Sequence, residues 1–159
     1  MRLLIINGVN INMLGIREKA IYGNKSYEDL CNYIRDVASK EKVKLNIFCS
    51  NYEGEIVEKI QDALGEYDGI IINPGAYAHY SIAILDALRS VNLPSIEVHL
   101  TDVTKREKYR QVLLTSDACF LTIMGKGFSG YKEAILEMKK KLGEWDESLF
   151  KRKLWHRWD

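Results

Sequence analysis

The sequence predicts an α/β protein whose core is a doubly wound parallel β-sheet. Short apolar segments rich in β-branched residues recur five times along the 159 residues, and helical patterns lie between and after them. Most of these segments are apolar throughout instead of alternating, which is typical of strands buried on both faces of a sheet. Because right-handed crossovers place helices on both faces, this alternation predicts one sheet of five parallel strands.

The expected strands and helices alternate from the first residues onward. We expect strands at residues 2–7, 43–49, 69–73, 95–100 and 118–124. We expect helices at residues 26–40, 54–65, 79–91, 104–115 and 128–142. The first helix begins with a capping-box signature, Ser26 with Asp29. For five strands of this kind, the flavodoxin-like order 2-1-3-4-5 is the first choice.

The length of the chain suits one domain with a core of its own. We predict that domain over residues 1–142 and a tryptophan-rich C-terminal extension over residues 143–159, which holds all three tryptophans. Docking of the extension on its own domain or across an oligomer interface is preferred, because tryptophan favours burial with its polar edge satisfied. A membrane-surface role is the alternative, since residues 151–159 hold four basic residues and one acid.

Charge and cysteine usage argue against several classes of protein. The formal net charge of +1 gives no global attraction to nucleic acid or acidic membranes. Cys31, Cys49 and Cys119 are odd in number and widely spaced, which indicates neither a disulfide framework nor a zinc site. The first apolar stretch, residues 3–6, is too short for a signal peptide or a membrane span. We therefore expect a cytoplasmic protein.

In doubly wound sheets, ligands bind beyond the carboxyl ends of the strands, where the strand order reverses. The polar residues that follow the first four expected strands are therefore the first candidates for a site. They are Asn7, Asn10, Arg17, Tyr22, Asn51, Glu53, Asn73, His79, His99, Thr101 and Arg110. No serine or cysteine among them lies in a nucleophile motif.

The segment GKGFSG, residues 125–130, fits the GxGxxG pattern but follows the last expected strand. A dinucleotide fingerprint belongs in the first βαβ unit, so we interpret these glycines as a tight turn with close helix packing. A flavin or phosphoacceptor site is also disfavoured. The loop NGVNINMLG after the first strand has no hydroxyl side chain, and Asn7 stands where a phosphoacceptor domain needs acidic residues.

Histidines stand at two adjacent strand ends, His79 and His99. Either one alone is typical of a hydrogen-bonded structural residue, whereas the pair favours acid–base work or polar contacts with a substrate. No HxH or HExxH spacing indicates a metal site. Asn73 either caps the following turn or offers donors to an anionic or hydroxyl-rich ligand, and local sequence leaves both open.

Arginines 106 and 110 have helical i, i+4 spacing in TDVTKREKYR. A solvated helix face is the ordinary interpretation of this charged stretch. The functional one is that one arginine turns toward the crevice, where it would bind a carboxylate by a bidentate pair, while the other faces solvent or a neighbour.

The loop GIREKAIYG, residues 15–23, places Arg17 and Tyr22 between two glycines. A tyrosine is a poor base near neutrality unless fixed positive charge stabilises its phenolate. An arginine beside it would make a base able to remove a proton next to a ketone. On local grounds the alternative also stands, in which Tyr22 packs its ring under a surface loop and Arg17 is solvated.

Five segments of the sequence, taken together, distinguish between these interpretations better than any one segment does. NGVNINMLGIREKAIYG, SNYEGE, DGIIINPGAYAHYSIAILDAL, IEVHLTDVTKREKYR and GKGFSGY resemble, in order and spacing, the signatures of type II 3-dehydroquinate dehydratases. The resemblance covers about residues 2–140. It implies a flavodoxin-like lyase that converts 3-dehydroquinate to 3-dehydroshikimate through an enolate, in the shikimate or quinate pathway, without metal or cofactor.

The resemblance also implies roles for single residues. Tyr22 would be the base, Arg17 the charge that stabilises the phenolate and the transition state, and His99 the general acid. Asn10 would hold a water at the enolate oxygen. The implied substrate-binding residues are Asn73, His79, Asp86, Leu100, Thr101 and Arg110, with backbone amides at 100 and 101. Asp86 would come from a neighbouring subunit, which implies trimers assembled into a homo-dodecamer.

The sequence also departs from the family pattern. Val9 stands where the family usually has proline, Tyr52 replaces a common histidine, and Asp102 an asparagine, while Ala78 and Tyr80 replace threonines around His79. Because these changes affect affinity or loop closure in principle, the alternative is a non-catalytic or divergent module that binds a related cyclic hydroxy acid.

Overall fold

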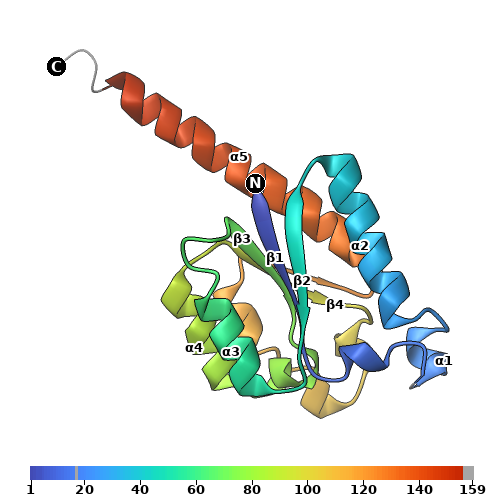
Figure 1. Ribbon diagram of the computed structural model, residues 1–159. Helices are drawn as coiled ribbons and strands as arrows, with labels where there is room; N and C mark the ends of the chain where they lie inside the picture. The colour runs from blue at the N-terminus through green and yellow to red at the C-terminus, as the bar shows by residue number, and fades with distance from the viewer. Residues whose placement is uncertain (17, 156–159) are drawn as a thin grey trace.

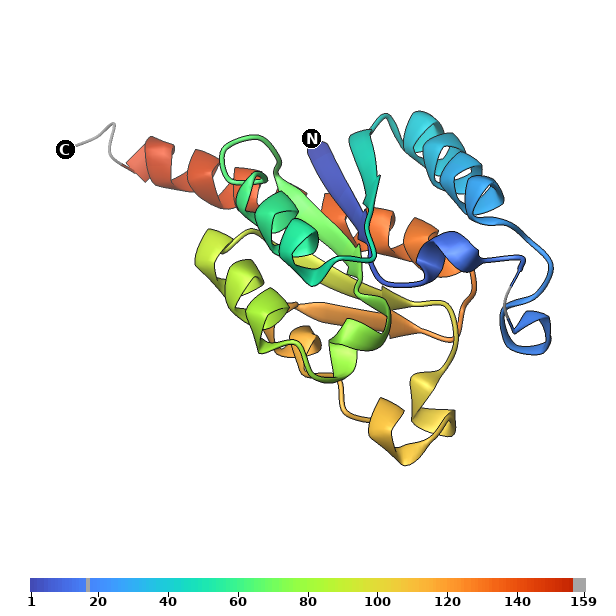
Figure 2. The same ribbon diagram turned by 60° about the horizontal axis from the view of Figure 1, so that its bottom comes forward.

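The computed structural model describes residues 1–16 and 18–155, with side chains described up to residue 143. Five parallel strands form one sheet in the order β2-β1-β3-β4-β5, which confirms the predicted architecture and order. The strands are β1 (Arg2–Asn7), β2 (Lys44–Cys49), β3 (Gly69–Asn73), β4 (Ser95–His99) and β5 (Leu121–Met124). Figure 1 and the turned view in Figure 2 show the sheet between two layers of helices.

Each face of the sheet has its own hydrophobic cluster. Helices α2 (Tyr27–Glu41) and α5 (Ser129–Trp155) cover the face that carries Leu3, Ile5 and Ile71. Helices α3 (Glu53–Gln61) and α4 (Ile82–Val91) cover the opposite face, with Leu4 and Ile6. Side chains alternate between the faces along each strand, so apolar runs without polar interruption are what this double cover requires.

Several local predictions are confirmed and their boundaries adjusted. Ser26 caps α2, with the reciprocal hydrogen bonds of a capping box to Asp29. The helix expected at 79–91 begins only at Ile82, because the Ser81 hydroxyl accepts the backbone N–H of Ile84 as its cap. Residues before it form the short 3₁₀ helix η2 (Gly75–His79). The helix expected at 128–142 continues as α5 through Gly143 to Trp155.

The helix expected over residues 104–115 is wrong. This segment instead forms three short 3₁₀ helices, η3 (Val103–Lys105), η4 (Lys108–Arg110) and η5 (Thr115–Ala118). Asp102 caps η3 through the backbone N–H of Thr104, and the backbone of Leu114 bonds to the carbonyl of Ala78. These hydrogen bonds, one local and one to a residue far away in the sequence, satisfy backbone N–H groups of the segment without a regular helix.

The carboxyl ends of β1 and β3 lie side by side, with Asn7 and Asn73 in register. Two glycines bring the loops that follow them into contact. A Cβ at Gly8 would lie 2.3 Å from the carbonyl oxygen of Pro74, and one at Gly75 would lie 2.5 Å from that of Val9. No larger residue fits at either position, so the two glycines allow the loops after β1 and β3 to pack directly against each other.

Candidate active site

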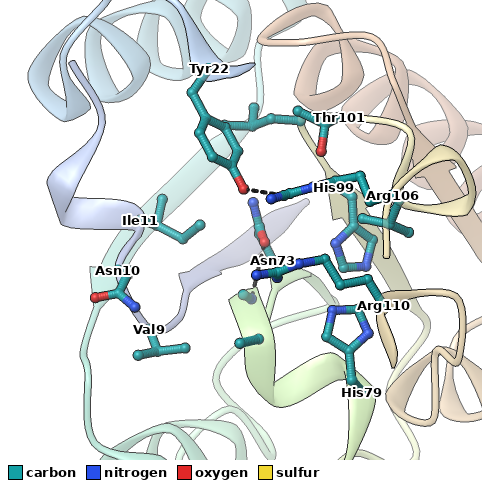
Figure 3. Close-up of a pocket in the computed structure, with 14 residues that line it drawn as sticks. Val9, Asn10, Ile11, Tyr22, Asn73, His79, His99, Thr101, Arg106 and Arg110 are labelled. Carbon is teal, nitrogen blue, oxygen red and sulfur yellow. Dashed lines mark hydrogen bonds between the residues drawn. The ribbon is translucent and has the colours of Figure 1, made fainter. Parts of the chain in front are cut away.

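A cavity of about 110 Å³ lies at the carboxyl ends of the strands (Figure 3). Its walls come from the loops after β1, β3 and β4. The lining residues are Val9, Asn10, Ile11, Tyr22, Asn73, Gly75, Ala76, His79, His99, Leu100, Thr101, Val103, Arg106 and Arg110. Eight of the ten residues proposed from the sequence for the site are therefore brought together here.

The other two residues are not part of this wall as described. Arg17 lies outside the described residues. Asp86 lies on α4, is exposed to solvent and does not line the cavity. The predicted role of Asp86 depends on a second subunit, so its position within one chain does not test that role.

Tyr22 reaches the cavity from a single helical turn, α1 (Lys19–Tyr22). Its hydroxyl receives a hydrogen bond of 2.7 Å from Nη1 of Arg106, and the guanidinium carbon of Arg106 lies 5.7 Å from the centre of the tyrosine ring. The side chain of Arg106 is only 11% exposed. The buried guanidinium therefore fixes the position of the phenol oxygen in the cavity.

Arg106 is a residue that sequence reasoning left undecided. The sequence predicted that only one of Arg106 and Arg110 would turn toward the crevice, whereas both line the cavity, and the segment that carries them is not an α-helix. Arg106 also lies 3.9 Å from a carboxylate oxygen of Glu18 and 3.6 Å from one of Glu107. Its charge is therefore shared between the phenol and two carboxylates at the mouth of the site.

Arg110 lies across the cavity from Tyr22 (Figure 3). Its Nε donates to Glu107 at 3.0 Å, and its guanidinium stacks near the ring of Tyr109. A hydrogen bond from its own backbone lowers the pKa of the Glu107 carboxyl, and the charges of Arg110 and Arg106 lower it further. The ionised Glu107 orients both arginines, so they present fixed positive charge to an anionic ligand.

His99 ends β4 and pairs with a carboxylate that sequence reasoning missed. Its Nε2 lies 2.7 Å from Oε1 of Glu97, which is fully buried. The two residues are neighbours on one face of the strand, because side chains at i and i+2 point the same way. A charged residue inside an apolar strand, two positions before a strand-end histidine, was the signal available in the sequence.

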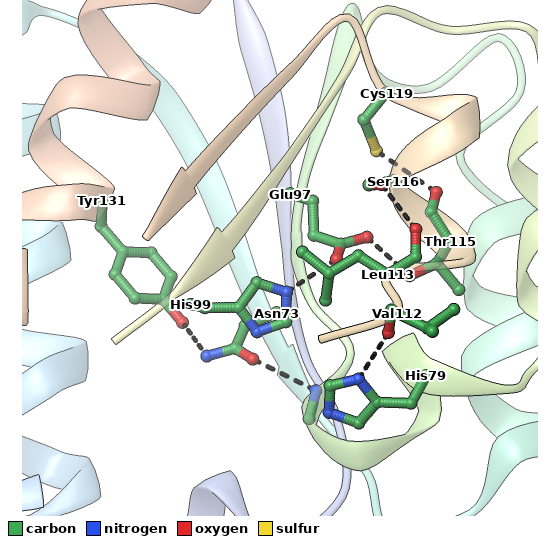
Figure 4. A network of polar contacts seen from close by, with 11 residues as sticks. Asn73, His79, Glu97, His99, Val112, Leu113, Thr115, Ser116, Cys119 and Tyr131 are labelled. Carbon is green, nitrogen blue, oxygen red and sulfur yellow. Dashed lines mark hydrogen bonds and ion pairs between the residues drawn. The ribbon is translucent and has the colours of Figure 1, made fainter. Parts of the chain in front are cut away.

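His79 is held by the backbone of a distant segment. Its Nδ1 lies 2.7 Å from the carbonyl oxygen of Val112. Figure 4 marks this contact with a dashed line. A carbonyl only accepts hydrogen bonds, so Nδ1 carries the proton and donates it. In the neutral ring, Nε2 is then left as an acceptor, which suits a hydroxyl group of a ligand.

Asn73 is oriented by a buried network. Its Oδ1 accepts the backbone N–H of Gly75 at 3.1 Å, and its Nδ2 donates to the hydroxyl of Tyr131 at 3.3 Å. The Tyr131 hydroxyl in turn donates to Oδ1 of Asn7 at 2.6 Å. Burial raises the pKa of Tyr131, which keeps the hydroxyl protonated and able to donate. The bond to Gly75 confirms that Asn73 caps the turn, and because Asn73 also lines the cavity, its contact with a ligand stays a prediction.

Asn10 has left-handed backbone geometry, with φ of 65°, and its N–H donates to Oδ1 of Asn51 at 2.8 Å. Asparagine tolerates this geometry better than most residues. On the opposite wall, the backbone carbonyls of His99 and Leu100 accept from Gly125 and Gly127, both of which have positive φ. The GKGFSG segment thus forms a turn that supports the segment at residues 99–101.

The described residues also bear on metal and membrane sites. They contain no group of three or more His, Cys, Asp or Glu side chains placed to hold a metal ion. Among them there is also no helix with the length and apolar character to cross a membrane.

Comparisons with known proteins all point to one family. Residues 1–139 match the family model described as dehydroquinase class II. A 3-dehydroquinate dehydratase of Clostridium acetobutylicum is 51% identical over 144 residues, which cover 91% of this chain and all of that protein. One from Clostridium beijerinckii is 50% identical, over 88% of this chain and 98% of that protein.

Solved structures agree with this. The type II dehydroquinase of Butyrivibrio crossotus has a TM-score of 0.86 and 48% identity, covering 87% of this chain and 97% of that one. That of Propionibacterium acnes has a TM-score of 0.83 and 32% identity, covering 86% and 94%. With the sheet order, the strand-end cavity and a family match over residues 1–139, this chain belongs to the class II dehydroquinase family.

Proposed function

We propose that this chain is a hydro-lyase that dehydrates 3-dehydroquinate to 3-dehydroshikimate in the shikimate pathway, and so serves aromatic amino acid biosynthesis. The observation that carries the proposal is the Tyr22–Arg106 hydrogen bond, in the same small cavity as His99. Family membership and relatives at about 50% identity support the same reaction.

The reaction begins with removal of a proton from the carbon next to the ketone. The Tyr22 phenolate takes this proton, and the C–H electrons move toward the ketone to form an enolate. Arg106 stabilises the phenolate by its direct hydrogen bond. Arg17 supplies further positive charge, as its place in the family motif implies. A water held by Asn10 donates a hydrogen bond to the enolate oxygen and stabilises the negative charge that develops there.

The second step expels the hydroxyl group. His99 donates a proton to the departing oxygen, which leaves as water, while the enolate electrons form the new carbon–carbon double bond. Glu97 accepts from the far side of the His99 ring, and this leaves Nδ1 for the substrate. The product is a conjugated enone.

The remaining residues position the substrate. The backbone amides of Leu100 and Thr101 bind its carboxylate, and Asn73, His79 and Arg110 bind its hydroxyl groups and fix the ring. Asp86 reaches the site from a neighbouring subunit, and the chains assemble as trimers into a homo-dodecamer. The exposed position of Asp86 on α4 is compatible with contact to a second chain.

Three further proposals concern the whole protein. The enzyme works in the cytoplasm, which its free Cys31, Cys49 and Cys119 support. It uses no cofactor, because proton transfer and elimination of water need none. The catalytic domain spans residues 1–142 and the extension begins at 143, which fits the end of the family match at residue 139.

An absorbance assay tests the activity. Ultraviolet absorbance rises when the protein meets 3-dehydroquinate, because a conjugated enone forms. Replacing Tyr22 by Phe lowers kcat by about a thousandfold, as loss of a general base does. The control is Tyr52→Phe, since Tyr52 is 71% exposed and lies outside the cavity.

Retention of the full rate by Tyr22→Phe would exclude the tyrosinate mechanism. Tight calorimetric binding of a cyclic hydroxy acid without any rise in absorbance would instead support a non-catalytic module. Of the departures from the family pattern, Val9 lines the cavity, whereas Ala78 and Tyr80 give that alternative little support. Ala78 is fully buried, Tyr80 is 62% exposed, and neither lines the cavity.

A further inference from the structure

Glu97 is a fully buried carboxylate in the middle of a strand. Its neighbours Ile96 and Val98 point to the face covered by α2 and α5. Glu97 therefore points to the opposite face, where η5 packs against β4 and α4. A carboxylate in such a place is costly unless each oxygen has a hydrogen-bond partner.

Each oxygen of Glu97 has one partner among the described residues. Oε1 lies 2.7 Å from Nε2 of His99, and Oε2 accepts a hydrogen bond of 2.6 Å from the hydroxyl of Thr115 (Figure 4). Thr115 is itself fully buried. The hydroxyl does not line the cavity, so it touches the proposed general acid only through the carboxylate.

We propose that Thr115 is a positioning residue for the proposed general acid His99. Its hydroxyl holds the Glu97 carboxylate in the one rotation that places Oε1 against Nε2 of His99. The ring is then fixed with Nδ1 directed to the cavity. The reaction that this arrangement serves is the dehydration proposed above, on which this inference rests.

Thr115 suits this role because the segment that carries it is anchored on both sides. The N–H of Leu114 bonds to the carbonyl of Ala78 at 2.8 Å, and the N–H of Phe120 bonds to that of Ser95 at 3.0 Å. The first bond ties the segment to η2 and the second ties it to the start of β4. These two bonds fix the segment that carries Thr115 beside the strand that carries Glu97.

The same segment also holds the second histidine of the site. The carbonyl of Val112, three residues before Thr115, accepts from Nδ1 of His79. Residues 112–115 therefore orient both imidazole rings. The Val112 carbonyl contacts His79 directly, and the Thr115 hydroxyl acts on His99 through the Glu97 carboxylate. Figure 4 shows both contacts, with Val112 beside His79 and Thr115 beside Glu97.

Two substitutions separate the hydroxyl from the shape of the side chain. Thr115→Val keeps the branched shape and removes the donor, whereas Thr115→Ser keeps the donor. We expect Thr115→Val to lower kcat about tenfold with KM within about twofold, because the acid acts on the leaving group and not in ground-state binding. Thr115→Ser restores kcat to within about threefold of the wild type.

Thr122→Val is the matched control. Thr122 pairs in register with Glu97 from β5, and no hydrogen bond of its hydroxyl is formed with the other described residues. This variant removes a hydroxyl next to the same carboxylate without removing a bond to it. We expect its kcat to equal that of the wild type.

Nitrogen NMR of the imidazole rings in the resting protein gives a readout that needs no substrate. The His99 signals are assigned by their loss in His99→Gln. In Thr115→Val they move toward those of a ring that exchanges between tautomers, while the His79 signals stay in place. Unchanged His99 signals with unchanged kcat in Thr115→Val would overturn the proposal, as would failure of Thr115→Ser to restore either.

The proposed dehydration and the proposed role of Thr115 can be refuted separately. A wild-type protein without enone formation would refute the proposed dehydration, yet the NMR comparison would still decide whether Thr115 orients His99. If Thr115→Val does not fold, the comparison of Thr115→Ser with Thr122→Val retains the test, because the proposal requires the former to keep the wild-type His99 signals.

Discussion

Arg106 is the residue whose importance emerges most clearly from the structure. It is 84 positions from Tyr22 in the chain, yet its guanidinium donates directly to the phenol oxygen. The sequence drew attention to Arg17 because it is five residues from Tyr22. Proximity in the sequence pointed to Arg17 as the cation beside Tyr22, and the fold brings a second cation, Arg106, to the same tyrosine.

Replacing Arg106 by Gln is expected to lower kcat about a hundredfold, because the phenolate loses a buried charge that donates a hydrogen bond to it. Steady-state rates from the enone absorbance measure the change. The control is Lys105→Gln, which removes a neighbouring charge whose side chain is 83% exposed. A rate for Arg106→Gln within twofold of the control would show that Arg106 does not support the base.

Tyr131 is the second residue that the sequence did not single out. Its buried hydroxyl connects Asn7 at the end of β1 with Asn73 at the end of β3. Tyr131→Phe leaves one amide oxygen without its donor and one amide nitrogen without its acceptor. We expect a loss of about 1–3 kcal/mol in the free energy of unfolding and a higher KM.

Urea denaturation and steady-state kinetics check this expectation. Tyr33→Phe serves as the control, since Tyr33 packs its ring against Phe128 at 5.9 Å. Equal unfolding free energies in the two variants would show that the Tyr131 hydroxyl has no structural role.

At the scale of elements, apolar periodicity correctly predicted strands and helices. The prediction was wrong where a segment had only charged residues at helical spacing. The strands and α2 follow from apolar periodicity and a cap. Residues 104–115 have no apolar stripe, and their backbone is satisfied by Asp102 and by the carbonyl of Ala78 instead of by a helix. Val103, Arg106 and Arg110 of this irregular segment line the site.

The capping box of α2 gives a prediction about pH. The backbone N–H of Ser26 holds the pKa of the Asp29 carboxyl below its ordinary value of 3.8. The folded-state pKa is depressed, so the stabilising contribution is fully present above pH 3.8 and is lost as the pH falls through the folded-state pKa.

We therefore expect Asp29→Asn to be less stable than the wild type at pH 7 and the difference to shrink below pH 3.8. Chemical denaturation at a series of pH values measures it. A difference that stays constant down to pH 2 would show that the ionised carboxylate does not stabilise the cap.

At the scale of the whole molecule, the exposed position of Asp86 connects assembly to activity. If Asp86 completes the site of a neighbour, a protein with Tyr22→Phe and a protein with Asp86→Ala are each inactive, but mixed oligomers contain sites with both native residues. Coexpression of the two variants is expected to recover part of the wild-type rate.

Light scattering provides the companion measurement. A dodecamer has a mass of twelve times 18.3 kDa. A monomeric mass, or the absence of recovery in coexpressed variants, would contradict a shared site.

Much of this protein was determined by its sequence alone. Apolar runs without polar interruption predicted strands covered on both sides, and the strand-end rule predicted a site that contains Asn10, Tyr22, Asn73, His79 and His99. These are local properties, because a strand's burial and a residue's place at its end depend on a few neighbours in the chain.

The tertiary structure decided how those residues are supported. Arg106 reaches Tyr22, Thr115 reaches Glu97 and Tyr131 reaches Asn7, across separations of 84, 18 and 124 residues. Each contact depends on side-chain directions from irregular segments or from elements at opposite ends of the chain. No periodicity encodes such a meeting, because it exists only once the sheet has brought the carboxyl ends of its strands together.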